Sequence, residues 1–111
     1  MDPAALNQEE YVRHVLDAYR KTPGTMGTVR RADRLLAAEL YQRGLSVKVV
    51  ENAFVLAATR RLVRPTDAPP SGTIRSLAYF LPVIEEVLGS RVSPEYFEYL
   101  RNKLSRASST R

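Results

Sequence analysis

The chain has 111 residues, and a hydrophobic content of 44% is enough for the core of one globular domain. It contains no cysteine, which excludes a disulfide framework, a thiol nucleophile and a cysteine-based zinc site. No apolar run approaches the ~20 residues of a membrane span, and the acidic start MDPAALNQEE is unlike a signal peptide. We therefore expect a cytoplasmic protein with no membrane partner.

The net charge of +5 is unevenly distributed along the chain. Residues 20–64 hold ten Lys or Arg against three acids, whereas residues 65–100 hold two against five. Fourteen of the 17 cations are Arg, whose planar guanidinium fits phosphate and carboxylate groups. The charge pattern therefore favours a polyanionic partner for the first part of the chain.

The first predicted element is an amphipathic helix from about Gln8 to Lys21. Asn7 followed by Glu10 matches a capping box. Four apolar residues then recur at helical spacing: Val12, Val15, Leu16 and Tyr19. His14, the single histidine, falls off this stripe, and we expect it at the surface.

A break containing Pro23, Gly24 and Gly27 precedes the second predicted helix, which Thr28 can cap. This helix ends at Gly44, a residue suited to the left-handed backbone after a helix. We expect its buried face to comprise Val29, Ala32, Leu36 and Leu40, flanked by Leu35 and Tyr41.

Arg30, Arg31 and Arg34 lie at the start of this second helix, where positive charge opposes the helix dipole. A glycine-containing loop that leads into a helix offers backbone N–H groups to an anion, so one interpretation is contact with a nucleic-acid phosphate. The other is a set of salt bridges within the protein. The candidate partners for these are Asp17, Asp33 and Glu51.

The chain is organised around a central helix that runs from an N-cap at Ser46 to Pro65. This helix is apolar on nearly every side, as expected of a helix buried among neighbours. Its end carries Arg60, Arg61 and Arg64. These cations either contact an anionic partner or only offset the helix dipole.

The second and central helices, joined at Gly44, resemble a helix-turn-helix. In that motif the start of the second helix meets base edges, and Lys48 and Asn52 would occupy this place. An ordinary helical hairpin is the alternative. It is favoured by Leu40, which stands where the motif wants a small residue.

After a proline-rich connector, a fourth helix is predicted from Ser71 or Thr73 to Gly89, with a break near Tyr79–Phe80 because Pro82 interrupts it. The last helix starts at the Ser93-Pro94 pair. On it, Tyr96 and Tyr99 are candidates for a partner surface. Residues 105–111 are predicted to form a disordered basic tail.

The run GTIRSLAYFLPVIEEVL resembles the ends of helical DNA-binding modules in bacterial replication-initiation and primosome proteins of the DnaD-like kind. The resemblance covers at most residues 46–88, and the chain lacks that family's C-terminal tryptophan signature. It implies that Arg75, Tyr79 and Phe80 lie near bound DNA. From the residues alone, the two aromatics are either base-stacking side chains or core residues.

Together these features predict an all-α bundle of about five helices around a buried central helix, with residues 1–104 as a single domain. The expected function is a small bacterial accessory domain that binds nucleic acid through an Arg-rich face, and the resemblance implies that this nucleic acid is DNA. The alternative is a protein-interaction module that forms a homodimer or joins a larger assembly. We expect no enzyme activity, no cofactor, no metal and no small-molecule substrate, because no nucleophile–base pair or ligand cluster stands out.

Overall fold

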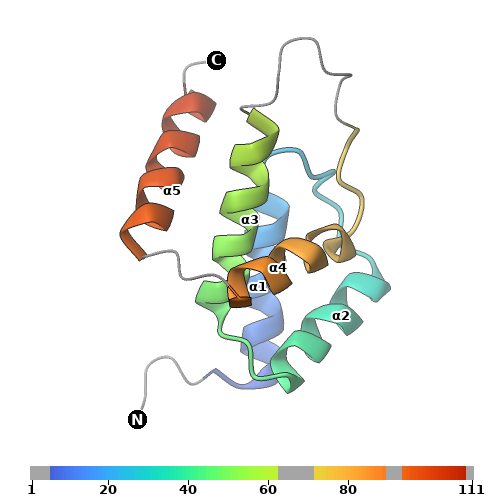
Figure 1. The fold of residues 1–111 in the computed structure, drawn as a ribbon. Coiled ribbons are helices and arrows are strands. Elements are labelled where there is room, and N and C mark those ends of the chain that lie inside the picture. Colours follow the sequence, from blue (N-terminus) through green and yellow to red (C-terminus); the bar gives the residue numbers. More distant parts are fainter. Residues whose placement is uncertain (1–5, 63–71, 90–93, 110–111) are drawn as a thin grey trace.

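Helices account for most of the computed structural model, which describes residues 6–62, 72–89 and 94–109 (Figure 1). In chain order the elements are α1 (Gln8–Lys21), α2 (Arg31–Gln42), α3 (Val47–Leu62), the 3-10 helix η1 (Leu77–Phe80), α4 (Leu81–Gly89) and α5 (Pro94–Ser109). Within these ranges the β pairing is limited to an isolated parallel bridge between Thr25 and Ile74. The predicted all-α bundle of five helices is confirmed.

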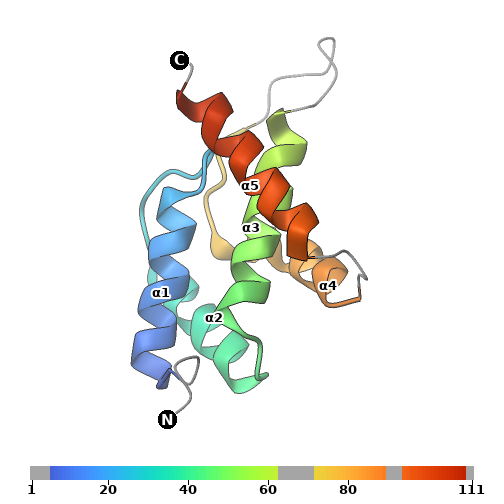
Figure 2. The ribbon, with the colours of Figure 1, turned by 90° about the vertical axis from the view of Figure 1, so that its left-hand side faces the viewer.

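Helix α3 occupies the centre of the bundle, as predicted. It packs against α1, α4 and α5, and Figure 2 shows α5 lying across it. Its Phe54 ring is 4.7 Å from the ring of Phe80 and 6.4 Å from that of Tyr19, measured between centroids. All three rings are almost completely buried, so the core joins α1, α3 and η1.

The predicted ends of three helices are also confirmed. Asn7 and Glu10 form the reciprocal capping box at the start of α1. The Ser46 hydroxyl accepts the N–H of Val49 at 3.1 Å at the start of α3. Gly44 has a φ of +79°, the left-handed conformation expected after α2. Pro65, Ser71 and Ser93 lie outside the described residues.

Two predicted helix starts are wrong, one because of a local cap and the other because of a contact distant in sequence. Helix α2 begins at Arg31 rather than after Thr28, since the Asp33 carboxylate accepts the Arg30 N–H at 2.9 Å. The segment from Gly72 to Ser76 is not helical. Ile74 instead exchanges backbone hydrogen bonds with the 22–30 loop, its N–H reaching the Gly24 carbonyl at 2.7 Å.

The predicted break at Tyr79–Phe80 is confirmed, because η1 ends there and α4 begins at Leu81. Pro82 falls in the first turn of α4, where a missing N–H costs nothing. Helix α5 runs to Ser109, so residues 105–109 of the predicted disordered tail are helical. Buried Phe97 and Leu100 pack this helix against the bundle. The helix-forming residues Lys103, Leu104 and Arg106 favour its continuation. None of the helices in the described ranges is long and apolar enough to span a membrane.

Two core tyrosines, Tyr11 and Tyr19, have hydroxyls that are buried without a hydrogen-bond partner in the described structure. Burial raises the pKa of Tyr11 from 10.0 to about 12. The folded state therefore holds the phenolic proton of Tyr11 more tightly than the unfolded chain does. The free energy of unfolding keeps its full Tyr11 contribution below pH 10 and decreases as the pH rises toward 12. Urea unfolding across this range should show the loss, and Tyr11→Phe should reduce it. A loss of equal size in the variant would contradict the assignment to Tyr11.

Candidate nucleic-acid interface

The structure divides the arginines predicted to bind nucleic acid into two groups. Arg60 belongs to the group engaged within the protein: its Nη1 donates to Glu86 Oε1 at 2.9 Å, and Nη2 pairs with Oε2. Arg43 makes a similar fork with Glu85, at 2.8 and 3.3 Å. These hydrogen bonds lower the pKa values of both carboxyls below their ordinary value. The two forks tie α4 to α3 and to the end of α2.

Arg61 is also engaged, at the junction of three segments. Its Nη2 donates to the Gly72 carbonyl at 2.6 Å, and its Nη1 lies 3.4 Å from the Tyr79 hydroxyl. The guanidinium also lies against Gly24, where a Cβ would be only 3.0 Å from Nε. Gly24 has a φ of +95°, a left-handed conformation that favours glycine, and a Cβ there would press on the Arg61 guanidinium. The Arg61 guanidinium therefore occupies the place beside Gly24, at one end of the predicted anion-binding loop, and no bound anion is needed to explain the glycine there.

The second group comprises exposed arginines around the start of α2. Arg31, Arg34 and Arg75 make no ion pair within the ranges that the structure describes. Arg30 is exposed as well, and within the described residues its Nη2 lies 3.9 Å from the Met26 sulfur. The intramolecular salt bridges that sequence reasoning left open for this region are therefore absent from the described part of the chain. Arg64 lies outside the described residues.

Asp33 brings Arg75 to the same end of α2, although more than 40 positions separate them in sequence. Its side chain is 2% exposed, with Oδ2 accepting the Arg30 N–H and Oδ1 accepting the Leu77 N–H, both at 2.9 Å. Arg75 precedes Leu77 by two residues, at most about 7 Å of chain. Figure 1 shows the 22–30 loop and the 72–76 segment running side by side toward α2. We call these two hydrogen bonds of the Asp33 carboxylate, to the N–H groups of Arg30 and Leu77, the Asp33 clamp. The Asp33 clamp therefore gathers arginines from two segments that are distant in sequence.

Sequence reasoning treated Asp33 as a partner for an arginine and missed its bond to Leu77. An acid three residues after a helix N-cap is a known signal for a reciprocal cap, and this signal could have placed the start of α2. The buried carboxylate also interacts favourably with the positive end of the helix dipole, whereas the positive charges of Arg31 and Arg34 are unfavourable there. No local pattern indicates Leu77 as the second donor.

The residues predicted to read bases, Lys48 and Asn52, lie on α3 and not among the exposed arginines at the start of α2. The Asn52 amide oxygen accepts from Arg101 of α5 at 3.3 Å, while Lys48 is exposed near the start of α3. Because α1, α4 and α5 all pack on α3, this helix is not a free recognition helix. The arrangement favours the ordinary helical hairpin over a groove-reading motif.

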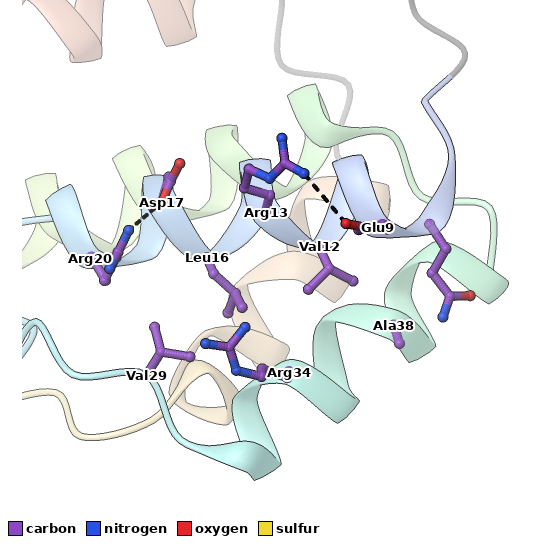
Figure 3. A pocket seen from close by; sticks show the side chains of 10 residues that line it. Glu9, Val12, Arg13, Leu16, Asp17, Arg20, Val29, Arg34 and Ala38 are labelled. Atoms are coloured by element: carbon purple, nitrogen blue, oxygen red, sulfur yellow. Dashed lines mark hydrogen bonds and ion pairs between the residues drawn. The ribbon is translucent and has the colours of Figure 1, made fainter.

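A groove of about 670 Å³ lies between α1 and α2, and Arg34 is one of the residues that line it (Figure 3). Arg34 points across it toward α1, beside Leu16. The opposite wall carries Arg13 and Arg20, each paired with an acid of its own helix, Glu9 and Asp17. The groove thus presents two arginines that are partly neutralised and one, Arg34, for which the described part of the chain supplies no ion-pair partner.

The remaining candidates are aromatic. Phe80 is completely buried and belongs to the core, whereas Tyr79 is 45% exposed. Tyr96 and Tyr99 are exposed on α5, with ring centroids 6.4 Å apart. Phe80 is therefore unavailable for stacking on a base, in contrast to the other three rings.

Comparisons with known proteins give no relative for this chain: no family model, no curated protein and no solved structure matches it.

Proposed function

We propose that this protein binds nucleic acid by contacting backbone phosphates with Arg30, Arg31, Arg34 and Arg75. The observation that carries the proposal is their shared position: they are exposed at one end of α2 without acidic partners in the described structure, while Arg43 and Arg60 are neutralised. A cluster of unneutralised guanidiniums has a strong affinity for phosphates, because it releases the counterions condensed on a nucleic acid.

The resemblance of residues 46–88 to DnaD-like modules favours DNA over RNA as the partner. On that basis we propose a bacterial cytoplasmic accessory role in replication, in a mobile element or in regulation. The residues proposed for phosphate contact differ from the sequence-based set, because Arg60 and Arg61 are engaged within the protein and Arg64 lies outside the described residues. The predicted base contact Asn52 is engaged as well.

The salt dependence of binding tests this proposal. Four phosphate contacts predict a log–log slope of about −2.8 for single strands and about −3.6 for a duplex. Affinity for labelled DNA or RNA, measured by fluorescence anisotropy, should therefore fall roughly 50- to 150-fold between about 50 and 200 mM salt. An affinity that does not change with salt would rule out the phosphate contacts.

A second candidate function is protein interaction through α5. Tyr96 and Tyr99 are 46% and 54% exposed and adjacent on the helix surface, and tyrosine is enriched at protein interfaces. Failure to bind any nucleic acid, together with a molar mass that rises with concentration in sedimentation experiments, would favour this homodimer or subunit role.

A further inference from the structure

We propose that the nucleic acid is single-stranded, and that one of its bases stacks on Tyr79. This inference rests on the proposed function, because the phosphates of the same strand would lie on the arginine cluster at the start of α2. It adds a class of substrate, an unpaired strand, and a residue that distinguishes such a strand from a duplex.

The geometry of η1 presents the Tyr79 ring to solvent. A 3-10 helix has three residues per turn, so positions 77 and 80 lie on one face and position 79 on another. Leu77 and Phe80 are completely buried, whereas Tyr79 is 45% exposed. The Tyr79 and Phe80 rings meet edge to face, with centroids 5.1 Å apart at 80°. The buried ring therefore fixes the orientation of the exposed one.

Arg61 restrains Tyr79 from its hydroxyl end. Its Nη1 lies 3.4 Å from the hydroxyl, and its central carbon is 5.9 Å from the ring centroid. The 2.6 Å bond to the Gly72 carbonyl and the close fit against Gly24 hold this guanidinium in place. A ring that is already ordered loses less conformational entropy when a ligand binds it. A cation beside an aromatic ring is also a combination found in proteins that bind single strands.

Phosphate contacts lie a short distance along the same segment. Arg75 and Tyr79 each lie two residues from Leu77, whose N–H is held by Asp33. Asp33 also holds the Arg30 N–H, so the stacking ring and the exposed arginines share one rigid support. A strand whose base stacks on Tyr79 would carry its phosphates past Arg75 toward Arg30. A duplex cannot use the ring without extruding a base, which costs unstacking and unpairing energy.

Substitution of Tyr79 by leucine tests the stacking contact. Tyr79→Leu should weaken binding of a single-stranded oligonucleotide by about 5- to 150-fold, the range for losing one base–aromatic stack, and should leave duplex binding unchanged. Tyr79→Phe keeps the ring and should bind nearly as well as the unsubstituted protein. The matched control is Tyr99→Leu, the same change at an exposed tyrosine of α5, which should have no effect. Circular dichroism and urea unfolding confirm that each variant is folded.

An abasic oligonucleotide separates stacking from phosphate contact. The unsubstituted protein and Tyr79→Leu should bind it with equal affinity, because neither can stack on a missing base. Equal binding of normal single strands by both proteins, or an equal loss on duplex, would overturn the stacking proposal. Loss of all salt-sensitive binding in arginine variants would still support the phosphate contacts, so the two proposals fail separately.

Discussion

Replacing Asp33 with alanine should lower the free energy of unfolding by at least about 3 kcal/mol. The carboxylate accepts one buried and one partly buried backbone N–H group, and hydrogen bonds to a charged group contribute about 1.5–3 kcal/mol each. Alanine leaves both donors without an acceptor and removes the only acid in the first turn of α2. Urea denaturation followed by circular dichroism measures the change.

Two further variants test whether the loss of stability comes from the two hydrogen bonds of the Asp33 clamp. Asp33→Asn keeps the shape but turns one acceptor into a donor, so it should also lose stability. Asp17→Asn removes a partly exposed acid of α1 whose ion pair in the described structure is with Arg20, and its effect should stay within about 0.5 kcal/mol. A loss below about 1 kcal/mol for Asp33→Ala would show that the two hydrogen bonds do not hold α2 to η1.

The double variant Arg31→Gln/Arg75→Gln should bind nucleic acid at least about tenfold more weakly, because each lost arginine–phosphate contact removes a charge-assisted hydrogen bond. The log–log salt slope should become shallower by about 1.4 to 1.8, as expected for the loss of two phosphate contacts. Anisotropy titrations at several salt concentrations measure both quantities.

The matched control is Arg43→Gln/Arg60→Gln, which changes the net charge by the same amount. Both of these arginines are paired with Glu85 and Glu86, so the control should retain the original slope. Equal losses in the two double variants would mean that total charge, rather than the cluster at the start of α2, governs binding.

Local sequence signals predicted the helices well where the relevant partners are within a few residues. The capping box of Asn7 and Glu10, the Ser46 cap and the left-handed Gly44 each act over one turn. The start of α2 was predicted wrongly, because the cap between Arg30 and Asp33 was not recognised. The segment before η1 was predicted wrongly, because its backbone N–H groups find acceptors that are distant in sequence. Ile74 bonds to the 22–30 loop and Leu77 bonds to Asp33.

The candidate site also combines features that are visible in the sequence with features that depend on tertiary contacts. Sequence identified the arginines, because residue type and charge density are visible in the chain. It did not separate Arg60, which pairs with Glu86, from Arg31, which has no acid partner in the described structure. An ion pair depends on which helices meet, and that is not visible in the spacing of either residue.

By itself, the sequence determined the all-α class, the buried central helix and the excess of arginine, because helical periodicity, capping and composition are local properties. Only the tertiary structure decided which arginines remain exposed and which two segments meet at the start of α2. The physical reason is that a buried carboxylate such as Asp33 must find donors wherever packing brings them. Here the second donor is the N–H of Leu77, which lies 44 residues further along the chain.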